Sequence, residues 1–253
     1  MKNSMNGCHS RESGNPVSPN HLDPRLRHSG MTCRCIILIS VIVFSFTAFA
    51  AENVISKKPA DFVDAGATIA GVKLDIRYFG SNNFIGRPID GYKAPKCFLT
   101  KKAADALSGV QKDLEPFGLK LLIYDCYRPQ MAVDNFARWA EDIKDTKMKS
   151  KYYPGVDKRN LFKLGFIAHK SGHTRGSTVD LTIDGINMGG HFDFFGDISG
   201  PKYQKAPAEA RAARLLLKTL MENHGFKNYD KEWWHFTLKD EPYPETYFGF
   251  AVE

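Results

Sequence analysis

Cysteine is scarce in this sequence, and most of it lies near the N-terminus. Of the five cysteines in 253 residues, only Cys97 and Cys126 lie beyond residue 35. Two cysteines are too few for the disulfide framework of a small secreted domain, and this pair lacks the Cys-x-x-Cys spacing of a redox or metal site. Their neighbours are apolar or aromatic, so one disulfide and two separate buried thiols both remain open.

Long hydrophobic runs are also absent, apart from one near the N-terminus. Residues 36–49 are almost all apolar and end in the small-residue pattern Ala48-Phe49-Ala50. Because this run is too short to span a membrane comfortably, it predicts a secretory signal peptide over residues 31–51, starting at Met31; an uncleaved anchor is the alternative. Residues 1–30 are polar and aperiodic, which predicts a disordered tail or an extension from a misplaced start codon.

No block or stripe of lysine and arginine occurs in the rest of the chain. Residues 52–253 contain 30 Lys and Arg against 26 Asp and Glu, so the formal charge of +7 for the whole chain falls to +4. This near balance argues against a nucleic-acid partner. There are no repeats, and about 200 residues are enough for one domain with a sizeable core, so a single domain is predicted here.

Hydrophobic periodicity predicts three helices and several short strands. The helices are expected over residues 101–114, 129–143 and 207–223, the first of them capped by Thr100. The strands are expected over residues 72–78, 119–123, 165–169, 179–183 and 234–238. The inward faces of the first two helices are expected to be formed by Ala103, Leu107, Val110, Leu114, Ala132, Phe136, Trp139 and Ile143. Helices and strands do not alternate strictly, so the predicted fold class is α+β, a mostly antiparallel central sheet flanked by helices.

Four polar residues in two distant segments suggest a metal site. His173 lies in a Ser/Gly/Thr-rich loop, seven residues before Asp180, which falls in an alternating run predicted to be a half-buried strand. His235 lies far downstream, three residues after Glu232. Two histidines and one aspartate are ligands that zinc accepts, and three protein ligands leave a fourth position open for water. The remaining Glu232 can take the proton of that water, so the pattern predicts a zinc hydrolase with one Zn²⁺ per chain.

The geometry of the second segment is constrained. On a regular strand Glu232 and His235 would point to opposite sides, so we expect Glu232 to lie in a turn or bulge before the strand. The alternative is that Trp233 and Trp234 form an ordinary aromatic part of the core, with a capping histidine.

Arg128 is the candidate for stabilising negative charge in a reaction. It follows a predicted buried strand and precedes Pro129, which favours an extended backbone. A planar guanidinium at the end of a strand near a metal can bind a developing oxyanion. The alternative is a surface ion pair with Asp125 or Asp134.

These residues carry a resemblance that covers nearly all of the chain from about Val72 onward. The segment from Ser171 to Thr182 resembles the Ser-x-His-x-x-Gly-x-x-x-Asp signature of the VanX-type D-alanyl-D-alanine dipeptidases, peptidase family M15 of the zinc DD-peptidase superfamily. Other segments resemble the same family in order: Gly91-Tyr92-Lys93, Asp125-Cys126-Tyr127-Arg128-Pro129, Tyr152-Tyr153-Pro154, Phe192-Asp193-Phe194, Met221-Glu222-Asn223, Glu232-Trp233-Trp234-His235 and Asp240-Glu241-Pro242-Tyr243-Pro244. The resemblance implies the zinc DD-peptidase fold, which the hedgehog signalling domain shares.

The resemblance also implies a role for each matching residue. His173, Asp180 and His235 match the zinc ligands. Glu232 matches the catalytic base, and Arg128 matches the arginine that stabilises the tetrahedral oxyanion. The substrate's ammonium group is expected at Tyr78 and Asp193, and its carboxylate at Ser171; these three residues come from the resemblance alone.

The expected function is hydrolysis of the dipeptide D-Ala-D-Ala in cell-wall peptide turnover or D-alanine salvage. With the signal peptide, the expected location is periplasmic or secreted, without stable membrane association after cleavage. One alternative is a D,D- or L,D-carboxypeptidase acting on longer peptidoglycan peptides. The other is a non-catalytic, zinc-stabilised binding module, which would need neither Glu232 nor Arg128.

Overall fold

The structure, a computed structural model, describes residues 54–253. The predicted N-terminal extension (1–30) and signal peptide (31–51) lie outside the described residues. Within residues 54–253, no helix is both long and apolar enough to cross a membrane.

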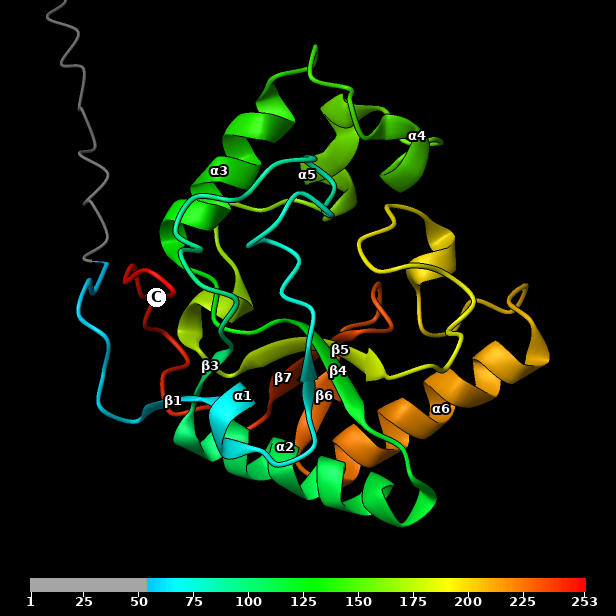
Figure 1. The fold of residues 1–253 in the computed structure, drawn as a ribbon. Helices are drawn as coiled ribbons and strands as arrows, with labels where there is room; N and C mark the ends of the chain where they lie inside the picture. The colour runs from blue at the N-terminus through cyan, green and yellow to red at the C-terminus, as the bar shows by residue number, and fades with distance from the viewer. Residues whose placement is uncertain (1–53) are drawn as a thin grey trace, which may run out of the picture. The chain divides into compact units, whose positions relative to one another are not determined.

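A five-stranded sheet lies at the centre of the fold (Figure 1). Its spatial order is β2 (Lys73–Leu74), β4 (Leu121–Asp125), β5 (Thr178–Ile183), β7 (His235–Leu238) and β6 (Phe226–Asn228). Only β2 and β4 are parallel; the other three pairs are antiparallel. The predicted α+β class with a mostly antiparallel sheet is therefore confirmed.

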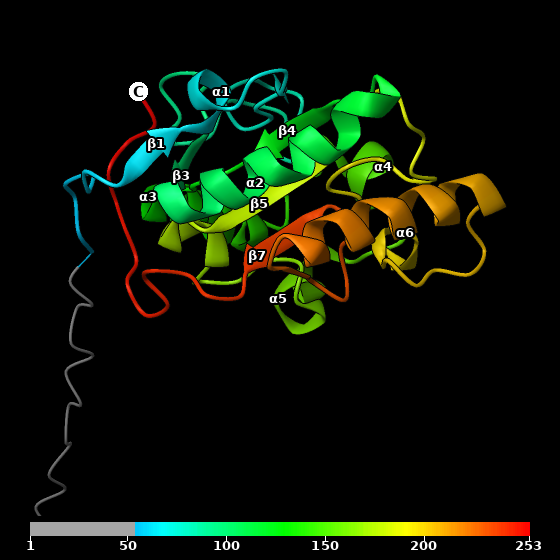
Figure 2. The same ribbon diagram turned by 90° about the horizontal axis from the view of Figure 1, so that it is seen from below.

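Helices cover both faces of this sheet. The two long helices α2 (Lys101–Leu114) and α6 (Ala208–Asn223) lie side by side on one face (Figures 1 and 2). Helices α3 (Gln130–Glu141), α4 (Lys149–Tyr152) and α5 (Leu161–Leu164) gather on the other side (Figure 1). Short 3₁₀ turns occur at η1 (Glu115–Phe117), η2 (Lys158–Asn160), η3 (Gly172–Arg175) and η4 (Asp197–Ser199).

A second, two-stranded sheet joins β1 (Phe62–Asp64) to β3 (Phe98–Thr100), with helix α1 (Ala65–Thr68) following β1. A disulfide between Cys97 and Cys126 links this small sheet to the end of β4. Of the two possibilities that the sequence left open for these cysteines, the structure shows the disulfide.

Helix α2 follows its sequence closely. The Thr100 side chain accepts a hydrogen bond from the Ala103 N–H, which satisfies a donor that the first turn would leave unpaired. All four residues predicted to face inward on α2 are buried. The predicted helix and its boundaries are thus confirmed, because a local cap and a regular apolar stripe determine both.

Other predicted elements are wrong in detail. The expected strand at 72–78 is only the two residues of β2, although the N–H groups of Asp75 and Arg77 still bond to the β4 carbonyls of Ile123 and Tyr124. Residues 165–169 form no strand: the N–H groups of Phe166 and Ile167 bond instead to the Leu161 carbonyl of α5. Ile143 is 56% exposed, because α3 ends at Glu141, before the apolar stripe reaches Ile143.

Strand β5 is buried on both faces and not on one as predicted. All six of its residues, including the polar Thr178, Asp180 and Thr182, are buried. The reason is its position as the middle strand, with β4 and β7 as neighbours and chain covering both faces. An alternating strand at the surface and one under a polar site have the same sequence pattern.

Candidate functional site

The register of the central sheet brings two of the predicted metal ligands together. Asp180 of β5 pairs directly with His235, the first residue of β7. His173 comes from η3, the turn just before β5, where the Ser171 side chain accepts a hydrogen bond from the His173 N–H. Gly176 ends this turn with a φ of 83°, and a side chain there would collide with the Phe62 ring. The turn therefore holds His173 close to Asp180.

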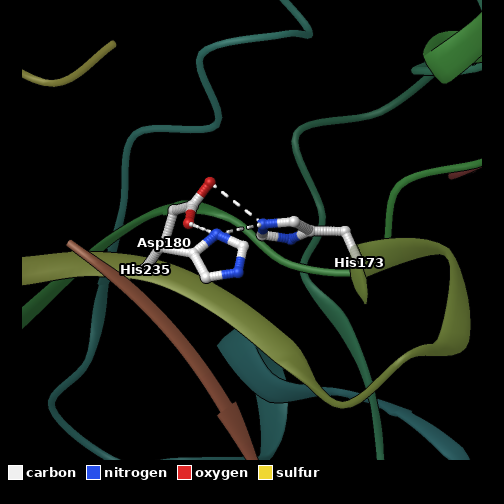
Figure 3. Close-up of side chains that lie close together, drawn as sticks. All are labelled: His173, Asp180 and His235. Atoms are coloured by element: carbon white, nitrogen blue, oxygen red, sulfur yellow. Dashed lines mark hydrogen bonds and ion pairs between the residues drawn. The ribbon is translucent and has the colours of Figure 1, made fainter. Parts of the chain in front are cut away.

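The three side chains converge at one point (Figure 3). His173 Nε2 lies 3.2 Å from Asp180 Oδ2, and His235 Nδ1 lies 3.1 Å from Asp180 Oδ1. The same two ring nitrogens are 3.3 Å apart. One potential ligand atom from each residue lies within 4.8 Å of the others. His173 and Asp180 are buried, and His235 is half-buried.

The donor set fits a zinc ion. Two imidazole nitrogens and one carboxylate are ligands that zinc binds, and three of them leave an open position. Although Asp180 Oδ1 is close to His235, it is buried and accepts no hydrogen bond of acceptable geometry among the described residues. A buried carboxylate oxygen without a hydrogen bond is costly, and a cation bound at this point would satisfy it.

Groups behind the metal site orient His173. Its Nδ1 lies 2.7 Å from the Cys126 carbonyl oxygen, an acceptor that requires a proton on Nδ1 and so leaves Nε2 free to bind a cation. Asp125 Oδ2 lies 3.6 Å from the same nitrogen. Burial lowers the pKa of His173, which favours the neutral imidazole. Burial works against the charged form of Asp180, but the two histidines outweigh it and lower the pKa of its carboxyl.

Glu232 lies in the turn that precedes β7, as the sequence predicted. Its N–H bonds to the Tyr229 carbonyl, and its own carbonyl accepts from the His235 N–H. This turn lets Glu232 and His235 face the same point, with Glu232 Oε2 3.5 Å from His235 Nδ1. Burial raises the pKa of Glu232 to about 7. Trp233 and Trp234 are both buried, so the segment is part of the core and of the site at once.

Arg128 is held by carboxylates inside the protein and not at its surface. Its Nε donates to Asp125 Oδ2 at 2.9 Å, and its Nη2 lies 3.5 Å from Asp180 Oδ2. The expected ion pair with Asp125 exists, but Asp125 is fully buried and also accepts from the Tyr92 hydroxyl at 2.6 Å. Burial works against the charge on Arg128, yet its anionic neighbours keep its pKa well above the ordinary value.

Tyr78 and Asp193, the pair taken from the resemblance, are in contact. The Tyr78 hydroxyl lies 3.2 Å from Oδ1 and 3.1 Å from Oδ2 of Asp193. Asp193 has a φ of 60°, the one positive φ among the described non-glycine residues, and such strain is concentrated at functional sites. Burial, together with the charge of Asp180, raises the pKa of Asp193 well above its usual range.

Most of these groups line one cavity of about 220 Å³; His173, Asp125 and Tyr92 do not. The predicted residues in its wall are Tyr78, Arg128, Ser171, Asp180, Asp193, Glu232 and His235. The wall also contains apolar side chains that sequence reasoning did not select for the site: Phe84, Val133, Phe136, Phe166, Ile167 and Phe195. Asp125, Tyr92 and Tyr229 were also missed as parts of the site. Their patterns are those of ordinary core or loop residues, so only the tertiary structure could identify them.

Sequence comparison with known proteins finds D-alanyl-D-alanine dipeptidases. The sequence profile of a peptidase M15 family, described as D-ala-D-ala dipeptidase, matches residues 58–253. A D-alanyl-D-alanine dipeptidase of Enterococcus faecalis is 43% identical over 189 residues, covering 72% of this chain and 93% of the relative. One of Streptomyces coelicolor is 39% identical over 198 residues, covering 76% and 98%. Among solved structures, the LdcB LD-carboxypeptidase has a TM-score of 0.38 at 18% identity, covering 74% of this chain and 71% of that chain, a likeness too weak to bear on function.

Proposed function

Because the chain belongs to the D-Ala-D-Ala dipeptidase family of M15 peptidases, we propose that it is a zinc-dependent hydrolase that splits D-Ala-D-Ala into two molecules of D-alanine. One observation carries the proposal: His173, Asp180 and His235 converge on one point, with the free carboxyl group of Glu232 beside them. A purely structural zinc would need no such free carboxyl group or any arginine nearby.

The charge of the site supports a cation and a cationic substrate group. Four buried or half-buried carboxyl groups, those of Asp125, Asp180, Asp193 and Glu232, all interact with the single guanidinium of Arg128. Ionising all four in a buried site would be costly, and burial accordingly raises the pKa of Asp125, Asp193 and Glu232. A divalent metal and the ammonium group of a free dipeptide would both reduce this cost.

His173, Asp180 and His235 are the residues that would hold the zinc. When bound, zinc supplies Lewis acidity, which activates a water molecule and polarises the scissile carbonyl group. Glu232 takes the proton of the attacking water and passes it to the leaving amine. A carboxyl group whose pKa is raised to about 7 is suited to both transfers, because it exchanges a proton readily near neutral pH.

Arg128 stabilises the negative charge that develops on the carbonyl oxygen. Its Nε donates to Asp125, which fixes the guanidinium plane, and Arg128 lines the cavity. Donors that are already oriented need no reorganisation when the charge forms, so they stabilise the transition state more than the ground state.

The remaining contacts would measure the length of the substrate. Asp193 and Tyr78 bind the ammonium group, and Ser171 binds the carboxylate. A dipeptide must present both charged ends within one small cavity, and a longer or capped peptide would leave a buried charge unpaired. The apolar wall that includes Phe136 and Ile167 would accept the methyl groups.

We place this activity outside the cytoplasm, in the periplasm or as a secreted protein. The predicted signal peptide supports this location, and so does the Cys97–Cys126 disulfide, because such bonds persist in oxidising compartments. Peptidoglycan fragments occur there, so we propose a role in cell-wall peptide turnover or D-alanine salvage, without stable association with the membrane.

The decisive experiment compares two substrates. The purified protein, its metal content measured, is incubated with D-Ala-D-Ala and with N-acetyl-D-Ala-D-Ala. We expect cleavage of the free dipeptide alone, abolished by a chelator and restored by zinc. Cleavage of the acetylated substrate would instead indicate a carboxypeptidase, and zinc binding without cleavage of either would indicate a binding module.

A further inference from the structure

The Cys97–Cys126 disulfide lies directly behind the metal site. The two cysteines are 29 residues apart in the sequence, and their Cα atoms are 5.2 Å apart. Cys97 and Cys126 are 0% and 2% exposed, so the bond is enclosed by the protein. It joins the residue before β3 to the residue after β4.

Cys126 belongs to a short segment that supplies several groups to the site. Its carbonyl oxygen accepts the hydrogen bond from His173 Nδ1. Asp125, the residue before Cys126, accepts a hydrogen bond from the guanidinium of Arg128, which lies two residues after Cys126. The residues between β4 and α3 belong to no strand or helix, so no regular ladder of hydrogen bonds fixes the backbone that carries these groups.

Noncovalent interactions also hold this segment: the buried Tyr127 donates its hydroxyl to the Phe250 carbonyl at 2.8 Å, and its ring stacks on Phe250. The Tyr127 N–H bonds to the Phe98 carbonyl at 2.9 Å, and the Arg128 N–H bonds to the His173 carbonyl at 3.3 Å. The acceptor of the Tyr127 N–H bond, Phe98, is the first residue of β3, and Cys97 immediately precedes it. The disulfide is therefore the covalent member of a small set of links between this segment and the small sheet.

A shift of the Cys126 carbonyl would act on His173 directly. The histidine binds a cation through Nε2 only while Nδ1 keeps its proton and the ring keeps its orientation, and both depend on this acceptor. The same shift would move the backbone next to Arg128, whose N–H is bonded to His173. Metal affinity and oxyanion stabilisation thus depend on the same few atoms.

We propose that the Cys97–Cys126 disulfide is a positioning element of the active site. It holds the Cys126 carbonyl at hydrogen-bonding distance from His173 Nδ1 and fixes the backbone that carries Arg128, so that both side chains are oriented towards the metal. This role rests on the proposed function, since it assumes that zinc binds at His173, Asp180 and His235. Formation of this one bond then makes the metal affinity and turnover of the enzyme depend on an oxidising compartment.

The test uses the full protein carrying Cys97→Ala and Cys126→Ala together. We expect the Kd for zinc, measured by competition with a chromophoric chelator, to rise by about 10- to 100-fold, as for other groups that orient a metal ligand. The kcat at saturating zinc should fall while KM changes little, because the loss includes the alignment of Arg128. The matched control is Leu107→Ala, which removes a buried side chain of α2 remote from the site and should lower Tm without changing the Kd for zinc.

Reduction of the unmodified protein gives a second measurement if the double variant does not fold. A phosphine reductant is added below Tm, thiol formation is followed by alkylation and mass spectrometry, and zinc release is followed with a metal-sensitive dye. Faster zinc release from the reduced protein with an unchanged circular dichroism spectrum would support the proposal. An unchanged Kd and kcat in a folded disulfide-free protein would overturn it. If the oxidised protein itself bound no zinc, the proposed function would fail instead.

Discussion

The two faces of β5 differ in what they demand of their residues. On one face Val179, Leu181 and Ile183 are fully buried and, by the alternation of the strand, point away from Asp180. Helices α2 and α6 lie side by side along one side of the sheet (Figures 1 and 2). On the other face of β5 Asp180 lies among His173, His235 and Arg128. The first face is held by apolar burial, which has no preferred direction, and the second by charge and hydrogen bonds of defined geometry.

This difference indicates where stability and chemistry are located. A methyl group lost from the apolar face should cost folding free energy and leave the site intact. A polar atom lost from the other face should change metal binding or turnover at once, because each buried charge there depends on particular partners. The following substitutions test that division.

The largest effect is expected for Glu232→Gln. Glu232 lies in the turn before β7 and contacts His235 beside the polar face of β5. This variant keeps the shape of the side chain but cannot accept the proton, so kcat for D-Ala-D-Ala should fall by about 10⁴-fold, the upper end for a general base. Zinc content, measured by elemental analysis, should stay at the level of the unmodified protein. A variant that lost its zinc would show that Glu232 is a ligand and not the base.

Arg128→Ala should follow, with kcat lower by about 10²- to 10³-fold and KM changed less. The physical reason is that the guanidinium contacts charge that exists mainly in the transition state. Steady-state kinetics over a range of D-Ala-D-Ala concentrations provides the measurement, and Arg128→Lys, which keeps the charge without the planar donors, is the control. A rise in KM with kcat unchanged would assign Arg128 to plain substrate binding.

Leu217→Ala tests apolar burial instead. Leu217 of α6 is fully buried, so its truncation should lower the free energy of unfolding by about 3 kcal/mol. Chemical denaturation measures this loss, while kcat and zinc content per folded molecule should stay the same. A tenfold fall in kcat of the folded variant would contradict the separation between the two faces.

The smallest effect is expected for Lys101→Ala at the surface of α2. Lys101 Nζ lies 2.6 Å from Asp105, but both side chains are about two-thirds exposed, 65% and 66%. Exposed ion pairs of this kind contribute about 0.3–0.5 kcal/mol, so the unfolding midpoint should barely move and should move less still in high salt. A loss comparable to that of Leu217→Ala would mean that this surface pair carries more stability than exposure allows.

Local sequence patterns predicted some of this structure well. The bounds of α2 follow from a capping threonine and an apolar stripe, interactions that span only three or four residues. Glu232 was expected in a turn because it and His235 had to face one point, and it lies in one. The expected strand at 165–169 failed because Phe166 and Ile167 bond back to α5, a partner that periodicity cannot identify.

The sequence by itself determined the three long helices α2, α3 and α6, the α+β class and the residue types of the proposed zinc site, because cap, periodicity and motif are properties of neighbouring residues. Only the tertiary structure decided that Cys97 pairs with Cys126, that β5 is buried on both faces, and that Asp125 holds Arg128 behind the site. These features depend on contacts between segments far apart in the chain, and the free energy of such contacts arises only when the sheet has brought the segments together.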